Sequence, residues 1–316
     1  MLGLAKSVFL FLSVTLFILG MLGNAFIGLV NVSSWFKSKR ISWSDFILTA
    51  LALSRIVLLW ILLADSIIVV FFFNIYTDGP ASSVIDVLWT FTNHLSMWLA
   101  TCLGVLYCLK IASFSHPTFL WLKWRVSRVV VWLLLGTLLI SCASSISLIH
   151  EFQNYSLLHE TPGIGNMTEH LRKQMGEYQM AYVFKMLWYL PSLILSLASY
   201  ILLILSLGRH MQQMRQNRTS PSDVSTEAHK RAIRIILSFL FLVLSYFLAF
   251  TMTSASYFLP SHEMVKFIGQ VIIMLYPAGH SFILILGNNK LKQTFVELLW
   301  CESGHLKPGS EGPLAP

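Results

Sequence analysis

The sequence predicts an all-α membrane protein in which seven transmembrane helices form a bundle and a short amphipathic helix follows them. Of the 316 residues, 56% are hydrophobic and only 11% are charged, so the chain has too little polar surface to cover a soluble globule of this size. Seven apolar segments are each long enough to cross a hydrocarbon core of about 30 Å, which takes about 20 helical residues. The alternation typical of membrane β-strands is not present in the sequence.

The seven predicted spans fill most of the chain and define one domain over residues 1–300. The first apolar segment runs past the usual length of a signal-peptide core and has no evident cleavage site, so we interpret it as a span. Residues 301–316 are rich in Gly, Pro and Ser and predict a disordered cytoplasmic tail. The spans are predicted at residues 7–30, 46–70, 87–108, 129–148, 182–207, 232–256 and 265–287.

The basic residues behind the net charge of +8 are concentrated in alternate loops, which indicates membrane topology instead of nucleic-acid binding. The loops after the first, third and fifth spans are rich in Lys and Arg, whereas the opposite loops are acidic. The basic side of a membrane protein is normally cytoplasmic, so we expect a plasma-membrane protein with an extracellular N-terminus and a cytoplasmic C-terminus. The basic surplus fits contact with lipid headgroups, and an acidic cytoplasmic partner is the alternative.

Modification sites are predicted in the longest outer loop, residues 149–181, and after the last span. Asn166 is the best N-glycan acceptor and Asn154 the second, with an unmodified surface Asn as the alternative. Cys301 ends the predicted amphipathic helix at residues 288–300 and is a plausible palmitoylation site, although such cysteines often stay unmodified. The four cysteines offer no extracellular disulfide to hold the outer loop.

Four polar side chains lie at similar depth in the inner half of the first, second and seventh spans. Polar groups in hydrocarbon need a partner, a cavity or a function. We therefore expect a buried cluster in which Arg55 donates hydrogen bonds to Asn24 and to groups near His280 and Ser281. A static structural cluster and a conformational switch are equally compatible with this pattern.

The outer half of the third span suggests a ligand site. Trp89 and Asn93 are one helical turn apart on the same face, and His94 is turned away by about 100°. An aromatic ring beside an amide offers apolar area and orienting hydrogen bonds, as small-molecule sites do. Tyr246 and Gln270 are expected to complete the cavity, although ordinary packing is the alternative for each aromatic residue.

Several stretches form motifs that occur in order along the chain, in or beside most of the spans. They are Leu51-Ala52-Leu53-Ser54-Arg55, Trp89 through His94, Leu109-Lys110-Ile111-Ala112-Ser113-Phe114-Ser115-His116-Pro117, Ser206-Leu207-Gly208-Arg209-His210, Thr226-Glu227-Ala228-His229, Tyr276-Pro277-Ala278-Gly279-His280-Ser281 and Asn289-Lys290-Leu291-Lys292-Gln293-Thr294. Over essentially residues 1–300, these motifs resemble the bitter taste receptors, the type 2 taste receptor family.

The resemblance implies a G-protein-coupled receptor fold, activation by small bitter ligands, and signalling through gustducin-type G proteins of the inhibitory class to phospholipase C and calcium. It also implies that Trp89 and Asn93 contact ligand. Gln270 stands where some members carry Glu, so neutral ligands with hydrogen-bonding groups are expected to fit better than cationic alkaloids. The residues expected at the G-protein interface, each with ordinary solvation as its alternative, are Lys110, His210, His229 and Lys230.

Other function classes fit the sequence less well. A small-molecule transporter or channel of the plasma membrane is the competing hypothesis, but only Arg55 approaches the membrane midplane. A membrane enzyme is not expected, because catalytic, phosphate-binding and metal-binding motifs are missing from the sequence. No metal or other cofactor is expected, and the sequence leaves homo- or hetero-oligomerisation open.

Overall fold

The structure, a computed structural model, describes residues 2–39, 42–72, 80–159, 167–216, 224–255 and 262–304. Across these ranges the regular structure is entirely helical. Seven of the helices contain segments that are long and apolar enough to cross a membrane, as the sequence predicts. The helices are α1 (Leu2–Ser38), α2 (Trp43–Phe71), α4 (Pro80–Ile111), α5 (Pro117–Trp124), α6 (Val126–His159), α7 (Met167–Gln216), α8 (Val224–Ala255), α9 (His262–Gly287) and α10 (Asn289–Gly304).

Each predicted span lies within one of these long helices, except that α8 ends at Ala255 and Ser256 is outside the described residues. The sequence analysis did not predict α5. This short helix begins with Pro117, whose fixed φ angle and missing N–H suit the first helical position. Local signals also define α2, where the Ser42 hydroxyl accepts a hydrogen bond from the Asp45 backbone N–H at 3.1 Å.

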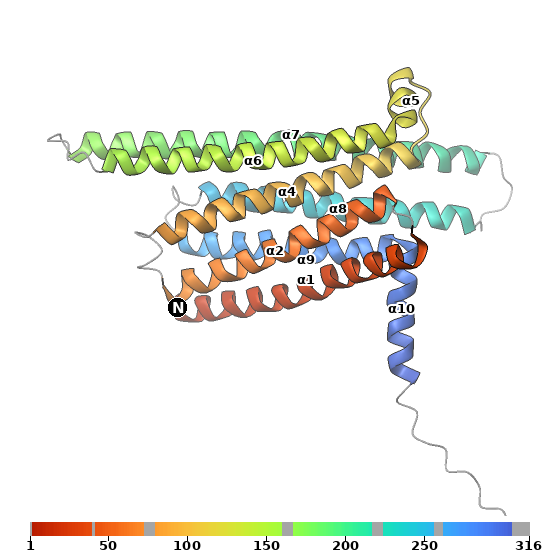
Figure 1. Cartoon of the computed structure of the whole chain (residues 1–316), viewed down its shortest axis with the longest axis horizontal. Helices are drawn as coiled ribbons and strands as arrows, with labels where there is room; N and C mark the ends of the chain where they lie inside the picture. Colours follow the sequence, from red (N-terminus) through yellow and green to blue (C-terminus); the bar gives the residue numbers. More distant parts are fainter. Residues whose placement is uncertain are drawn as a thin grey trace, which may run out of the picture.

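The long helices run side by side in a bundle in which α4 is central (Figure 1). α4 packs against α2, α6 and α7, while α1 packs against α2 and α9, and α8 against α7 and α9. In the apolar, membrane-spanning stretch of α4, 72% of the residues are buried, compared with 28% in the corresponding stretches of α1 and α6. α4 is therefore placed to contact elements on several sides of the bundle.

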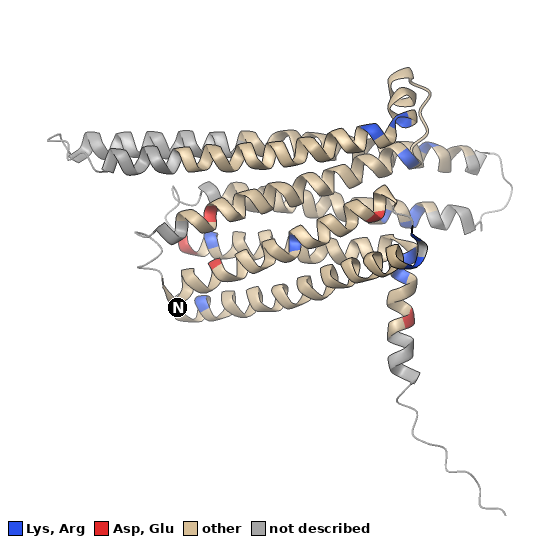
Figure 2. Cartoon of the chain, in the orientation of Figure 1, with Lys and Arg blue, Asp and Glu red and all other residues tan. Residues whose placement is uncertain are grey.

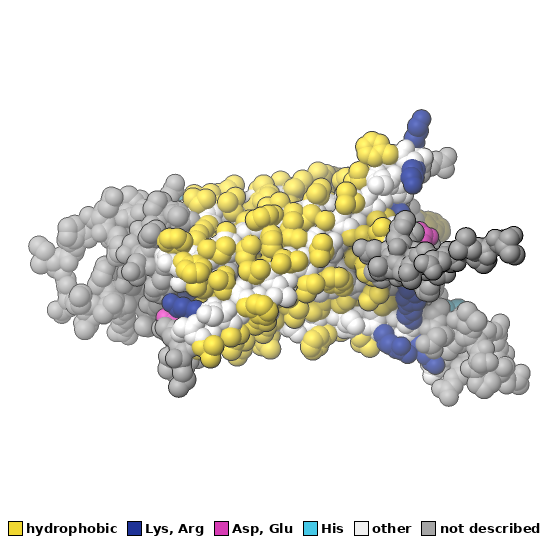
Figure 3. All heavy atoms as spheres, turned by 90° about the horizontal axis from the view of Figure 1, so that it is seen from below, with side chains coloured by type: hydrophobic (Ala, Val, Ile, Leu, Met, Phe, Trp, Pro, Cys, Tyr) yellow, Lys and Arg dark blue, Asp and Glu magenta, His cyan; other side chains and the backbone are white. Residues whose placement is uncertain are grey.

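The surface of the bundle is apolar, as a lipid-facing surface must be. Large side chains such as Leu22, Trp132, Phe241 and Leu248 are each more than 60% exposed in the isolated chain. Figure 3 shows hydrophobic side chains covering the middle of the visible face, with most of the visible Lys and Arg toward one end. The buried interior, in contrast, contains Asn, Arg, His and many Ser and Thr side chains. This distribution indicates that lipid solvates the outside of the bundle and that the polar groups pair within it.

The described basic residues concentrate at the end of the bundle where α5 and α10 lie, and the N-terminus lies at the opposite end (Figure 2). This arrangement agrees with the loop pattern of the sequence. Which end faces the cytoplasm remains a prediction from the positive-inside bias.

Two segments are more helical than the sequence suggested. Residues 149–181, predicted as an outer loop, are largely helical, since α6 continues to His159 and α7 begins at Met167. Hydropathy marks only the membrane part of a helix, and residues 167–181 are rich in good helix formers such as Glu, Leu, Arg, Lys, Gln and Met. The predicted tail is likewise helical at its start, because α10 extends to Gly304, and residues 305–316 are outside the described part.

The amphipathic helix predicted at residues 288–300 corresponds to α10, which projects from the bundle where α9 ends (Figure 1). Its apolar side packs on the bundle, with Leu291 fully buried and the Phe295 ring 5.6 Å from Phe26 of α1. The Lys290 ammonium lies 3.3 Å from the Asn31 side-chain oxygen and 3.6 Å from the Asp45 carboxylate. One lysine thus links α10 to α1 and α2.

Candidate functional site

The predicted ligand-site residue Asn93 is the centre of a hydrogen-bonded cluster that joins three helices. Its side-chain amide donates to the Tyr189 hydroxyl of α7 at 2.8 Å and to the Tyr246 hydroxyl of α8 at 2.6 Å. Asn93 is 1% exposed, and both tyrosines are also buried. Because unpaired polar groups are costly in such an interior, these bonds fix how α4, α7 and α8 sit relative to one another.

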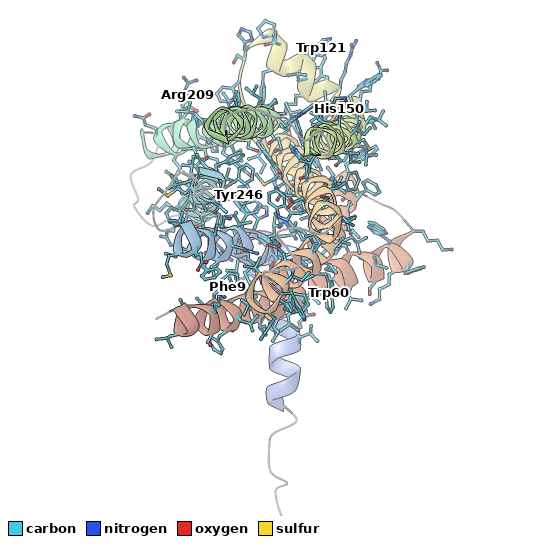
Figure 4. The ribbon with its side chains drawn as sticks, turned by 90° about the vertical axis from the view of Figure 1, so that its left-hand side faces the viewer. Phe9, Trp60, Trp121, His150, Arg209 and Tyr246 are labelled. Carbon is cyan, nitrogen blue, oxygen red and sulfur yellow. The ribbon has the colours of Figure 1, made fainter. Side chains whose placement is uncertain are left out.

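Aromatic rings surround this amide. His94 stacks on Tyr189 with ring centroids 3.9 Å apart, and Tyr246 stacks on Phe250 at 6.1 Å. Trp89, one turn from Asn93, packs against Phe250 at 5.8 Å and is only partly buried. Figure 4, viewed along the bundle, shows Tyr246 inside the ring of helices. The structure therefore brings Trp89, Asn93, His94 and Tyr246 together, and we call them, with Tyr189 and Phe250, the outer cluster.

Gln270 has a different environment from the one expected. Its side-chain amide donates to the Asp65 carboxylate of α2 at 2.6 Å, and its nitrogen lies 3.4 Å from the Ser66 hydroxyl. The sequence analysis grouped Gln270 with Tyr246, but its hydrogen bonds run to α2. The sequence also suggested that the missing Glu at this position removes a carboxylate. The structure places the Asp65 carboxylate directly beside it, so an anionic group is retained on the neighbouring helix.

The predicted inner cluster forms around Arg55, which is fully buried. Its guanidinium hydrogen-bonds the Nδ1 atom of His280, and its Nε donates to the Ser96 hydroxyl at 3.4 Å. It also lies 5.4 Å from the centre of the Tyr276 ring, within cation–π range. Arginine can only donate, so the bonded Nδ1 must accept and His280 is neutral with its proton on Nε2. Arg55 thus connects α2 to α4 and α9.

One predicted contact in this cluster is wrong. Arg55 does not donate to Asn24, whose side-chain oxygen has no hydrogen-bond partner. The Asn24 amide instead donates to the backbone oxygens of Gly20 at 2.8 Å and Pro277 at 3.3 Å. The second bond joins α1 to the backbone of α9 at Pro277, the proline inside that helix. Ser281 bonds locally, to the Ala278 carbonyl at 2.6 Å.

Equal depth in the membrane did not reveal these pairings, because depth fixes the height of a side chain and not the direction in which it points.

The four residues predicted at the G-protein interface lie toward the basic end of the bundle. Lys110 is in the last turn of α4, and Lys110, His210 and Lys230 are exposed. The rings of His210 on α7 and His229 on α8 are 5.2 Å apart. α7 and α8 are therefore close together at the basic end of the bundle.

The predicted modification sites are only partly described. Asn166 is outside the described residues, and Asn154 and Cys301 lie in α6 and α10 but their side chains are not described. The described cysteines Cys102, Cys108 and Cys142 are free thiols. Within the described ranges, no group of three or more His, Cys, Asp or Glu side chains is arranged to hold a metal ion.

Sequence reasoning missed several residues that complete these clusters. Four residues outside the predicted site contact the predicted residues directly: Tyr189, Tyr276, Ser96 and Asp65. A tyrosine or serine in an apolar span carries no periodic signal of its own. The only available signal was the match in depth between Asn93 and polar residues on other spans.

Comparison with known proteins identifies close relatives over the whole chain. The model of the taste receptor protein family (TAS2R) matches residues 1–303. Taste receptor type 2 member 3 of Pongo pygmaeus is 66% identical over 312 residues, which is 99% of each chain. The protein of the same name from Homo sapiens is 66% identical over 314 residues, and that from Mus musculus is 57% identical over 315 residues, with coverage of 99% and 100% of each chain.

Proposed function

Because the chain belongs to the taste receptor protein family (TAS2R), we propose that it binds small bitter compounds at its outer cluster and activates a heterotrimeric G protein of the gustducin class. Family membership and seven apolar helices support a G-protein-coupled receptor of bitter taste. The proposed downstream signal is phospholipase C activation and calcium release. The proposed location is the plasma membrane, with the basic end of the bundle in the cytoplasm.

The observation that carries the proposal is the link from Asn93 to tyrosines on both α7 and α8. Asn93 lies one turn from the partly exposed Trp89, so a ligand that packs against Trp89 and Phe250 would be within one turn of these hydrogen bonds. The ring faces offer apolar area, and the amide and the hydroxyls offer donors and acceptors. This combination suits compounds that carry both apolar groups and a few polar atoms.

Coupling to the other end follows from which helices the outer cluster joins. α4, α7 and α8 each continue to the basic end, where His210 and His229 bring α7 and α8 together. A ligand that favours one arrangement of Tyr189 and Tyr246 would therefore favour one arrangement of the inner helix ends. Binding at the two ends is then reciprocal, so a G protein at the basic end raises agonist affinity.

The proposed ligand range includes compounds with a basic amine. The Asp65 carboxylate is partly buried and accepts a hydrogen bond from Gln270. Gln270 is the position at which some members of the family carry Glu. An ammonium group near Asp65 gains a charge-assisted hydrogen bond that a neutral analogue lacks. Asp65 on α2 is therefore a proposed specificity residue.

Covalent modification is proposed just outside the membrane at both ends of the bundle. Asn166 and Asn154 are the proposed glycan acceptors, and Cys301 is the proposed palmitoylation site after α10.

A calcium assay in cells that express the chain with a chimeric G protein tests the proposal. Trp89→Ala is expected to lower agonist potency while surface expression stays at the wild-type level. Trp132→Ala, a lipid-facing residue on α6, is the matched control and is expected to leave potency unchanged. An unchanged dose response for Trp89→Ala, or equal effects of the two variants, would contradict the proposed ligand site.

A further inference from the structure

A groove between α8 and α9 opens toward lipid and leads to a basic side chain. Its volume is about 500 Å³, and its walls are mainly apolar. On α8, Leu237 is 48% exposed and Phe241 is 70% exposed, so the groove faces outward, away from the outer and inner clusters. The groove is formed by Leu237, Ser238, Phe241, Leu242, Gly279 and Ile283.

A missing side chain creates the hollow on the α9 side. Gly279 has no Cβ, and an added one would come within 3.5 Å of Leu242, in ordinary van der Waals contact. On α8, Ser238 is small, and its hydroxyl is turned back to the Arg234 carbonyl at 2.9 Å. Two small residues, Ser238 on α8 and Gly279 on α9, thus line the groove.

The groove points along both helices toward Arg231. Arg231 and Ser238 are two turns apart on one face of α8, because seven residues rotate the helix by about 700°. On α9, Leu286, Ile283 and Gly279 follow one another on one face in the same way. The Arg231 guanidinium donates to the Leu286 carbonyl at 3.2 Å, so it closes the space between α8 and α9 at the basic end of the groove.

We propose that this groove binds an anionic phospholipid, with one acyl chain between α8 and α9 and the phosphate on Arg231. The single bond to Leu286 occupies one of the five N–H donors of the guanidinium, and Arg231 is exposed. Planar guanidinium groups match phosphate oxygens in pairs. A zwitterionic lipid offers the same acyl chain but no net negative charge. The combination of an apolar channel and a guanidinium at its end therefore favours the anionic lipid.

The proposed lipid holds the inner end of α8 against α9. α8 also carries His229 and Lys230, so its position at the basic end governs the surface proposed for the G protein. The binding step itself needs neither agonist nor G protein, and it is testable apart from the proposed signalling function.

Photo-crosslinking in nanodiscs tests the binding. The purified full chain is reconstituted in phosphatidylcholine with a small fraction of phosphatidylserine or phosphatidylcholine that carries a diazirine on its acyl chain. Peptides containing residues 237–242 and 279–283 are then quantified by mass spectrometry. The phosphatidylserine probe is expected to label these peptides about five-fold more than the phosphatidylcholine probe, since a basic side chain near the surface contributes about 1 kcal/mol.

Two variants separate the headgroup from the acyl chain. Arg231→Gln is expected to reduce labelling by phosphatidylserine to the level of phosphatidylcholine, and Arg128→Gln on α6, which removes the same charge from the same end, is expected to change neither. Ser238→Trp fills the groove and is expected to abolish labelling by both probes, whereas Leu248→Trp on the lipid face of α8 is not.

Equal labelling by the two probes, or equal effects of Arg231→Gln and Arg128→Gln, would overturn the proposal. If Ser238→Trp fails to fold, the arginine pair still decides the question, because both of those side chains are exposed.

Discussion

The hydrogen bonds of Asn93 make a quantitative prediction about how α4, α7 and α8 are held together. Asn93→Ala removes two interhelical bonds, to Tyr189 at 2.8 Å and to Tyr246 at 2.6 Å. Such bonds contribute on average about 0.6 kcal/mol each in a membrane protein. The truncation also leaves space in a buried site. We therefore expect the free energy of unfolding to fall by about 1 to 3 kcal/mol.

A double-mutant cycle isolates the bond to α8. Tyr246→Phe removes the hydroxyl and keeps the ring contacts with Phe250 and Tyr276. If Asn93 and the hydroxyl interact as the structure indicates, the double variant is less destabilised than the sum of the single variants. The coupling energy is expected to be about 0.6 kcal/mol and at most about 1.7 kcal/mol.

Tyr107 provides a matched control on α4. Its hydroxyl lies 3.4 Å from the Ser44 hydroxyl, and it is about 21 Å from Asn93 along the helix axis. Tyr107→Phe combined with Asn93→Ala is expected to be additive within about 0.3 to 0.5 kcal/mol. Reversible unfolding of the purified chain in mixed micelles measures all of these variants. Additivity in both cycles would refute the assignment of an interhelical bond to Asn93.

Three further predictions concern the charged side chains. Asp65→Asn should lower the potency of agonists with a basic amine roughly tenfold or more in the calcium assay, because a hydrogen bond to a charged group contributes about 1.5–3 kcal/mol. The potency of neutral agonists should stay unchanged. Lys290→Ala should speed amide hydrogen exchange in α10, whereas Lys292→Ala, which removes the same charge from the same helix, should not. The local stability that α10 loses should stay below about 1 kcal/mol, because the Lys290 side chain is 35% exposed. Arg55→Lys should lower the melting temperature although the charge is kept, because an ammonium cannot donate in the fixed planar geometry of a guanidinium, and a melting temperature equal to wild type would contradict the inner-cluster geometry.

The bundle could be predicted from the sequence because lipid imposes simple rules on composition and length. All seven spans were located, since an apolar run of about 20 residues has few alternatives. The helical parts of residues 149–181 were missed because they lie beyond the apolar windows, where hydropathy carries no signal. The short helix α5 was missed because its eight residues are too few to cross a membrane, and only Pro117 marked its start.

The candidate sites were predictable one residue at a time, but their partners were not. Depth in the membrane identified Arg55 and His280 as buried polar groups that need partners, and the spacing of one helical turn from Trp89 identified Asn93. Depth did not give the direction in which each side chain points, so Asn24 was wrongly paired with Arg55. Rotation about each helix axis is set by packing against neighbours, which a single sequence does not contain.

The sequence analysis did not identify Tyr276, the residue that connects the outer cluster to the inner cluster. Its ring lies 5.1 Å from Tyr246 of the outer cluster, 5.5 Å from His280 and within cation–π distance of Arg55. Tyr276 directly precedes Pro277, whose carbonyl accepts the Asn24 hydrogen bond that anchors α9 to α1. A shift of Tyr246 therefore meets a ring held between a buried cation and a fixed turn of α9. This contact makes the outer and inner clusters one continuous packed unit, so we expect that a ligand which moves Tyr246 also changes the surroundings of Arg55.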